Sequence, residues 1–137
     1  MDYKLELIAV PVSDVDRAKS FYADKLGWGA DHDHKVSDDV RFVQVTPPGS
    51  ACSIAFGKGV SPSEPGSLQG LQVVVDDVEA AHADLSGRGV EVGDVQVMDS
   101  GAPRAARDGD ALDFVGFLFF KDPDGNGWGI QQMPGRA

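Results

Sequence analysis

The sequence predicts an α+β fold in which two tandem βαβββ modules form a single domain over residues 1–137. Residues 8–16 (IAVPVSDVD) and 71–79 (LQVVVDDVE) match position by position at a constant offset of 63 residues. In both copies an apolar run typical of a strand passes directly into a helical pattern, and three strand-like stretches follow. We therefore expect a first module at 4–57, a linker at 58–68 and a second module at 69–133.

A capping residue opens each predicted helix. Ser13 is followed three residues later by Asp16, and Asp76 is followed three residues later by Glu79. A serine or aspartate at the N-cap accepts a hydrogen bond from an unpaired backbone N–H, and the acid three residues on can reach back. The sequence thus predicts that both helices begin at the same point of the repeat.

The helices are expected over about residues 14–26 and 77–88, because their apolar residues recur on one stripe. The first stops at Gly27 and the second at Gly87 or Gly89, since glycine commonly ends a helix. These stripes are core positions.

Strands with turn residues between them fill the rest of each module. In the first module they are expected at residues 31–36, 40–46 and 51–56, and in the second at 91–98, 113–121 and 127–132. The loop of residues 99–112, rich in Gly, Ala, Arg and Asp, has no counterpart in the first module and is expected to be irregular. A functional lid and a merely mobile loop are both open for it.

Charge and cysteine content exclude several classes of protein. The net charge of −10 would repel a polyanionic backbone, which disfavours nucleic-acid binding. The single cysteine, Cys52, cannot form an internal disulfide and is expected to be a buried, inert thiol. Neither a membrane span nor a secretion signal is visible, so a cytoplasmic protein is expected.

Three short motifs carry a family resemblance. They are the strand-to-helix junction at 12–15 (VSDV) with 20–22 (SFY) and 26–27 (LG), its weaker copy at 75–78 (VDDV), and 120–126 (FKDPDGN). In order and spacing the chain resembles the vicinal oxygen chelate superfamily over about residues 5–132. That superfamily includes glyoxalase I, extradiol dioxygenases, fosfomycin-resistance enzymes and bleomycin-resistance proteins. The resemblance implies curved mixed sheets enclosing a cleft, and a homodimer whose modules pair within or across chains.

The metal ligands that the resemblance implies do not map onto metal-binding residues. Counting along the repeat places them at Leu7, Gly70 and Gly129, none of which has a donor atom in its side chain. Glu6 is the only acid nearby, and it should point to the other face if Leu7 points inward. We therefore expect the metal-free branch, with no cofactor.

Histidines leave one other metal site open. His32 and His34 alternate with aspartates and share one face of a strand, but no third ligand is visible nearby. A solvated polar strand is the simpler interpretation. His82 is expected at the surface or boundary of the second helix, and no catalytic residue can be assigned.

The remaining candidates line the cleft as ligand-binding residues. Strand parity places Gln72 on the face of Gly70, and Gln131 on the face of Gly129, so two amides can bind a neutral or mixed polar ligand. Leu7 is also predicted to line the cleft. The other predicted wall residues are aromatic, with plain core packing as the alternative: Trp28, Phe42, Phe117, Phe119 and Trp128.

Two main functions follow as hypotheses. The first is a metal-free binding protein that sequesters a small organic molecule, an antibiotic being one class. The second is a lyase, isomerase or dioxygenase-type enzyme, with or without a metal. No evident pair of titratable groups supports the second. A structural homologue with a lost binding role is the third alternative.

Overall fold

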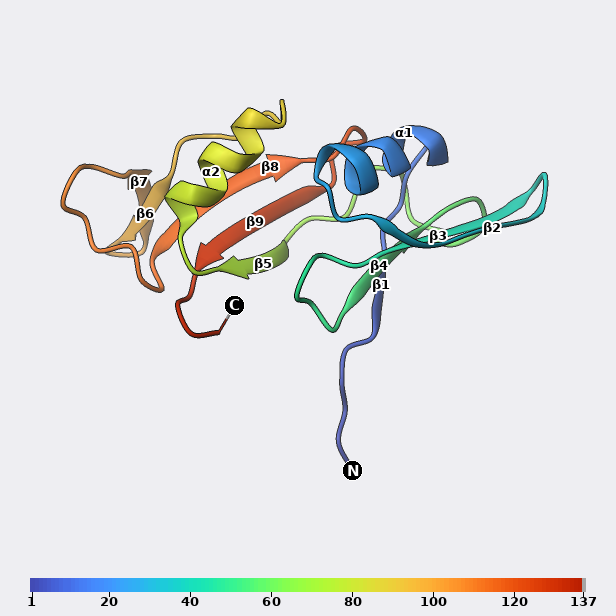
Figure 1. The fold of residues 1–137 in the computed structure, drawn as a ribbon, viewed down its shortest axis with the longest axis horizontal. Helices are drawn as coiled ribbons and strands as arrows, with labels where there is room; N and C mark the ends of the chain where they lie inside the picture. The colour runs from blue at the N-terminus through green and yellow to red at the C-terminus, as the bar shows by residue number, and fades with distance from the viewer. Residues whose placement is uncertain (137) are drawn as a thin grey trace. The chain divides into compact units, whose positions relative to one another are not determined.

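The computed structural model describes residues 1–136, which form two compact units (Figure 1). Unit 1 comprises residues 1–68 together with 122–126, and unit 2 comprises residues 69–121 with the described residues after 126. Unit 1 has the order βαβββ and unit 2 has the same order with one further strand, so the predicted α+β class and repeat are confirmed. No helix among residues 1–136 is long and apolar enough to cross a membrane.

Unit 1 is a four-stranded mixed sheet with one helical segment. Its strands are ordered β1-β4-β3-β2, with β1 parallel to β4 and the other pairs antiparallel. The elements are β1 (Leu7–Ala9), α1 (Val15–Lys19), the π-helical segment η1 (Ser20–Lys25), β2 (Ala30–Ser37), β3 (Val40–Val45) and β4 (Ser53–Phe56).

Unit 2 repeats this order and adds a strand. Its sheet is ordered β5-β9-β8-β6-β7, with β5 parallel to β9. The elements are β5 (Leu71–Val75), α2 (Val78–Gly87), β6 (Gln96–Asp99), β7 (Ala102–Ala105), β8 (Gly116–Lys121) and β9 (Gly127–Gln132).

The added strand corrects the prediction of an irregular loop at 99–112. β6 and β7 form an antiparallel hairpin, and Ser100 and Gly101, both with positive φ, make its turn. Arg104 fixes the hairpin by pairing with Asp99 and Asp110. The strand predicted at 91–98 was also too long, because regular pairing begins only at Gln96.

The N-caps lie one residue later than predicted, at Asp14 and Asp77. Asp14 accepts a hydrogen bond from the backbone N of Arg17 at 3.0 Å, and Asp77 accepts two, from Glu79 and Ala80. The prediction of Ser13 and Asp76 as caps was wrong by one residue in both copies. The two observed caps are still 63 residues apart, so both helices begin at the same point of the repeat.

Each sheet packs one face against its own helix. In unit 1 the rings of Tyr22 (η1) and Phe56 (β4) lie with centroids 5.6 Å apart. In unit 2, α2 lies across β8 and β9 (Figure 1). The buried side chains on the helix-facing sides are Val43, Val45, Ile54 and Phe56 in unit 1, and Leu118, Phe120, Trp128 and Ile130 in unit 2.

Candidate functional site

The face of the second sheet that points away from its core carries four of the predicted ligand-binding residues. Phe119 pairs with Gly129, Gly129 pairs with Gln72, and Phe117 pairs with Gln131, so all five residues share one face. Their sequence neighbours Leu118 and Ile130 point into the core. We call this set (Gln72, Phe117, Phe119, Gly129 and Gln131) the amide–aromatic face.

The two amides of this face are hydrogen-bonded to each other. Gln72 Nε2 donates to Gln131 Oε1 at 2.5 Å, and Gln131 Nε2 donates to the carbonyl oxygen of Phe114 at 2.8 Å. The amide of Gln131 is thereby fixed in orientation. Gln72 Oε1 receives no hydrogen bond from the described residues, so it can accept one from a ligand.

Two phenyl rings form the apolar part of the face. Phe117 and Phe119 are parallel within 1°, with ring centroids 6.1 Å apart. Phe119 remains 43% exposed, which is unusual for a large aromatic residue. A Cβ at position 129 would lie 3.3 Å from Phe119 Cε1, so the ring rests against a glycine that leaves room for it. The result is a pair of parallel, stacked rings beside an ordered amide pair.

The corresponding face of the first sheet is more polar. Leu7 pairs with Ser53, and Gln44 lies between Ala55 and His32 in register. Ser53 Oγ accepts a hydrogen bond from Gln44 Nε2 at 3.2 Å and shares another with Thr46 Oγ1. We call this side the polar face; it also carries His34 and the half-buried Phe42, which pair with each other across β2 and β3.

The two tryptophans predicted for the wall lie elsewhere. Trp128 is 4% exposed and stacks on Phe120, on the helix-facing side of the second sheet. Trp28 lies beside Tyr22, with ring centroids 6.0 Å apart. Both therefore contribute to packing rather than to the amide–aromatic or the polar face.

The helix-facing side of unit 1 has a separate cavity of about 470 Å³. Four of its charged side chains are in ion pairs: Arg41 pairs with Asp16 and also with Asp33, and Lys35 pairs with Asp38. The Arg41 guanidinium, assisted by Lys19, holds the pKa of Asp33 well below its ordinary value. The lining residues are Ser13, Asp14, Val15, Asp16, Lys35, Ser37, Asp38, Arg41 and Lys58.

A family model places this architecture among known proteins. The model described as Glyoxalase/Bleomycin resistance protein/Dioxygenase superfamily matches residues 4–130. The chain belongs to this superfamily. The recognition made from the three motifs is therefore confirmed.

Solved structures of the superfamily resemble the chain along nearly its whole length. TnmS3, an antibiotic binding protein from Streptomyces sp. CB03234, is 33% identical, with 97% of each chain covered and a TM-score of 0.72. A glyoxalase/bleomycin resistance protein from the same organism is 34% identical, covering 94% of this chain and 100% of the other, with a TM-score of 0.70. A superfamily member from Sphaerobacter thermophilus DSM 20745 is 25% identical, covering 95% and 97%, with a TM-score of 0.72. No curated protein matches the chain at comparable stringency.

The side chains present do not fit the metal that the superfamily resemblance implies. Leu7 and Gly129 have no donor atoms, and Phe119 rests where a side chain at 129 would begin. Gly70 has a φ of +83°, a conformation that favours glycine over any metal-ligating residue. Within residues 1–136, no three His, Cys, Asp or Glu side chains gather in a metal-binding group.

Cys52 is a poor nucleophile. It is partly buried, and this burial, together with the charge of Glu6, raises the pKa of its thiol. The thiolate is the reactive form, so its population at neutral pH is reduced. The prediction of an inert thiol agrees with this environment, although the side chain is only half-buried.

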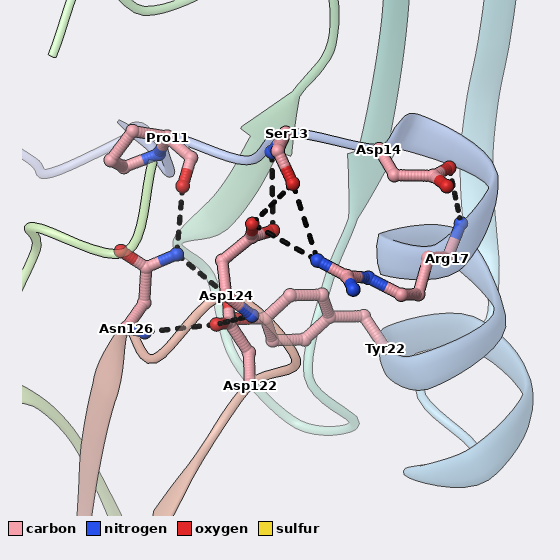
Figure 2. Close-up of polar contacts among 8 residues, drawn as sticks. All are labelled: Pro11, Ser13, Asp14, Arg17, Tyr22, Asp122, Asp124 and Asn126. Atoms are coloured by element: carbon pink, nitrogen blue, oxygen red, sulfur yellow. Dashed lines mark hydrogen bonds and ion pairs between the residues drawn. The ribbon is translucent and has the colours of Figure 1, made fainter. Parts of the chain in front are cut away.

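Sequence reasoning missed a buried polar network at the turn of residues 122–126, which Figure 2 shows. Asp122 Oδ2 accepts hydrogen bonds from Tyr22 Oη and Asn126 Nδ2, each at 2.7 Å. Asn126 Nδ2 also donates to the carbonyl of Pro11, and its Oδ1 accepts from the backbone N of Leu68.

A second contact fixes the same turn to the start of α1. Asp124 accepts hydrogen bonds from the Ser13 hydroxyl and from Arg17, the latter as an ion pair at 3.1 Å (Figure 2). A Cβ at Gly66 would lie 2.1 Å from the Asp124 carbonyl, so the glycine permits this close approach. The turn chemistry of 122–126 was visible in the sequence, but its partners, which lie 58 to 115 residues away, were not.

Proposed function

We propose that the protein binds a small organic molecule on the amide–aromatic face without a metal, and that it sequesters this molecule rather than transforming it. The observation that carries the proposal is the stacked pair of parallel rings, Phe117 and Phe119, beside the hydrogen-bonded amides of Gln72 and Gln131. Ligand sites typically combine such apolar walls with a few placed polar groups.

An antibiotic is the ligand class that the comparisons favour. TnmS3 is described as an antibiotic binding protein, and it resembles the chain over 97% of both lengths. The five residues of the amide–aromatic face include no acid, base or nucleophile. General acid–base chemistry needs such groups within hydrogen-bond reach of the substrate, so this face suits binding better than catalysis.

The experiment is a thermal-shift and calorimetric screen of purified protein against antibiotics with planar, carbonyl-bearing ring systems. A true ligand should raise the Tm progressively with concentration, as mass action requires. Phe119→Ala and Gln72→Ala should each weaken binding, by about tenfold for the loss of one buried aromatic contact or one good hydrogen bond. Val36→Ala, on an exposed position of β2, is the matched control and should leave affinity unchanged.

Two results would overturn the proposal. Mass spectrometry that finds the bound compound chemically altered would favour the alternative, a lyase, isomerase or dioxygenase-type enzyme. Loss of binding after treatment with a chelator, restored by a divalent metal, would contradict the metal-free part. Recovery of the intact ligand in one-to-one complex supports sequestration.

We also propose that the protein forms a homodimer. Met1, Tyr3 and Leu5 alternate with polar residues and are all exposed, in the segment that leads into the edge strand β1. Exposed apolar residues beside a sheet edge are typical of surfaces that pair with another chain. Light scattering should give twice the chain mass, and a variant with polar residues at positions 3 and 5 should shift toward the monomer.

A further inference from the structure

The two sides of strand β2 have different chemistry. On the side that faces α1, Asp33 pairs with both Arg41 and Lys19. On the other side, His32 and His34 pair in register with Gln44 and Phe42 and belong to the polar face of unit 1. The strand therefore has one side of paired charges and one side that carries two imidazoles.

The two histidines stand close together and are open to solvent. Their rings are inclined by only 23° to each other, with centroids 5.7 Å apart, and both residues are exposed. Neither imidazole has a hydrogen bond or ion pair with a described residue. β2 is the edge strand of its sheet, so no further strand covers its outer side. Nothing within residues 1–136 thus accounts for the paired rings by packing or hydrogen bonding.

We propose that His32 and His34 form a chelating pair for a divalent transition-metal cation of the Cu²⁺, Ni²⁺ or Zn²⁺ type. Imidazole nitrogen is a preferred ligand of these ions, with nitrogen–metal distances of about 2.0–2.1 Å for zinc. Two nitrogens on one such ion lie about 3 Å apart. The rings must tilt toward each other from the 5.7 Å separation, and their exposure lets them do so without breaking a protein contact.

The carboxylate of Asp31, which precedes His32, is held at the end of a neighbouring strand. The pairing of β2 with β3 shifts by one residue between Ala30 and His32, so Asp31 is the extra residue of a bulge. Its side chain accepts a hydrogen bond from Thr46, which belongs to the same side of the sheet as Gln44. Asp31 does not gather with the two imidazoles in a three-donor group of the described residues, so the proposed ion has two protein nitrogens and water fills its remaining positions.

This site is distinct from the superfamily's metal positions and does not rest on the proposed function. Leu7 lies on β1 and the histidines lie on β2, at opposite edges of a four-stranded sheet. Three strand spacings separate them, which amounts to roughly 14 Å. A small-molecule ligand on the amide–aromatic face and a cation on β2 can therefore be tested separately.

The test is a calorimetric titration of tag-free protein with CuCl₂ and NiCl₂, in a buffer that does not chelate. We expect one cation per chain, and His32→Gln and His34→Gln should each lower the affinity by about tenfold or more. His82→Gln is the matched control, since His82 lies on α2 and is the remaining histidine of the sequence. It should leave the titration unchanged.

A second measurement locates the ion. Paramagnetic Cu²⁺ should broaden the backbone amide signals of β2 and β3 in an NMR spectrum and leave those of α2 sharp. Circular dichroism of the variants shows whether they keep the fold. The proposal is overturned if His82→Gln weakens binding as much as the β2 variants do, if the β2 variants bind like the parent, or if the broadening centres outside β2 and β3.

Discussion

Unit 1 holds its helix with a buried polar network, whereas unit 2 holds α2 with apolar side chains and one amide. Tyr22, fully buried, donates its hydroxyl to Asp122. The residue 63 positions later is Leu85, which is buried and has no polar atom in its side chain. Instead, Gln132 Oε1 accepts a hydrogen bond from the backbone N of Val78 at the start of α2. The two copies thus share a topology while relying on different interactions.

The faces away from the two cores differ in the same way. Unit 2 presents parallel phenyl rings and an amide pair, and unit 1 presents two imidazoles with a hydroxyl and amide cluster. Duplication requires only that one side of each sheet remain apolar for the core. The other side was free to diverge, which is why the two candidate binding surfaces have unrelated chemistry.

The largest expected effect comes from breaking the network that distinguishes unit 1. Asn126→Ala removes the partner of Pro11 O, Asp122 Oδ2 and Leu68 N in a fully buried place. Each buried polar group left unpaired costs about 1–3 kcal/mol, so we expect a loss of about 3 kcal/mol or more in the free energy of unfolding. Urea denaturation measures it, and a loss under about 1 kcal/mol would show that solvent replaces the network.

Two variants with smaller expected losses of stability compare unit 1 with unit 2. Tyr22→Phe makes unit 1 resemble unit 2 by deleting one donor, and it should cost about 1–3 kcal/mol because the acceptor is a carboxylate. Gln132→Ala removes the side-chain oxygen that accepts a hydrogen bond from Val78 N at the start of α2. Because this bond is only partly buried, we expect a loss of about 1 kcal/mol in the free energy of unfolding. An equal loss for all three variants would contradict the contrast between the units.

Removing the N-cap of each helix should change stability by a smaller amount, and by a different amount in α1 and α2. Asp77 accepts two backbone hydrogen bonds and Asp14 accepts one, so Asp77→Ala should destabilise the protein more than Asp14→Ala. Typical losses for such changes are about 1 kcal/mol. Thermal unfolding of both variants checks the order, with Ser13→Ala as a test of whether the neighbouring hydroxyl acts through Asp124 rather than as a cap.

The smallest expected effect on stability is the loss of the Asp33 ion pairs at acid pH. Arg41, then Lys19, lowers the pKa of Asp33 in the folded protein, so this carboxylate stabilises the fold above its ordinary pKa near 3.8. The stabilisation is lost as the pH falls below that value through the lower folded pKa. For partly exposed pairs we expect about 0.5–1 kcal/mol. Arg41→Gln should flatten this part of the stability curve below pH 4, and an unchanged slope would exclude the Arg41–Asp33 pair as its source.

The repeat made much of the fold predictable, because caps, glycine stops and alternation are local signals. The ends of both helices, and of five of the six strands predicted after the helices, were predicted to within about three residues. The cap prediction failed at Ser13 because its hydroxyl is taken by Asp124, 111 residues away. β7 was missed since ion pairs of Arg104, rather than hydrophobic alternation, fix that hairpin.

Strand parity also predicted which side chains share one side of the second sheet. It placed Gln72 on the side of Gly70 and Gln131 on the side of Gly129, and the register of β5, β8 and β9 brings Gln72, Gly129 and Gln131 to one side of the sheet. The same rule puts Trp128 on the opposite side, since it directly precedes Gly129, yet its size suggested a binding wall. The close approach of the Phe119 ring to Gly129 could not be predicted from the sequence, because it depends on a side-chain conformation and not on residue spacing.

The π-helical turn of η1 records how the two copies came to differ in length. Asp77 follows Asp14 by 63 residues, but Gly89 follows Gly27 by only 62, and both glycines have positive φ after their helices. The first copy therefore has one residue more between cap and stop. A π-turn accommodates one residue more than an α-turn does, as the bond from Leu26 N to Phe21 O shows. A one-residue insertion is thus absorbed inside the helix, while the N-cap aspartate and the glycine at the helix end keep their roles in both copies.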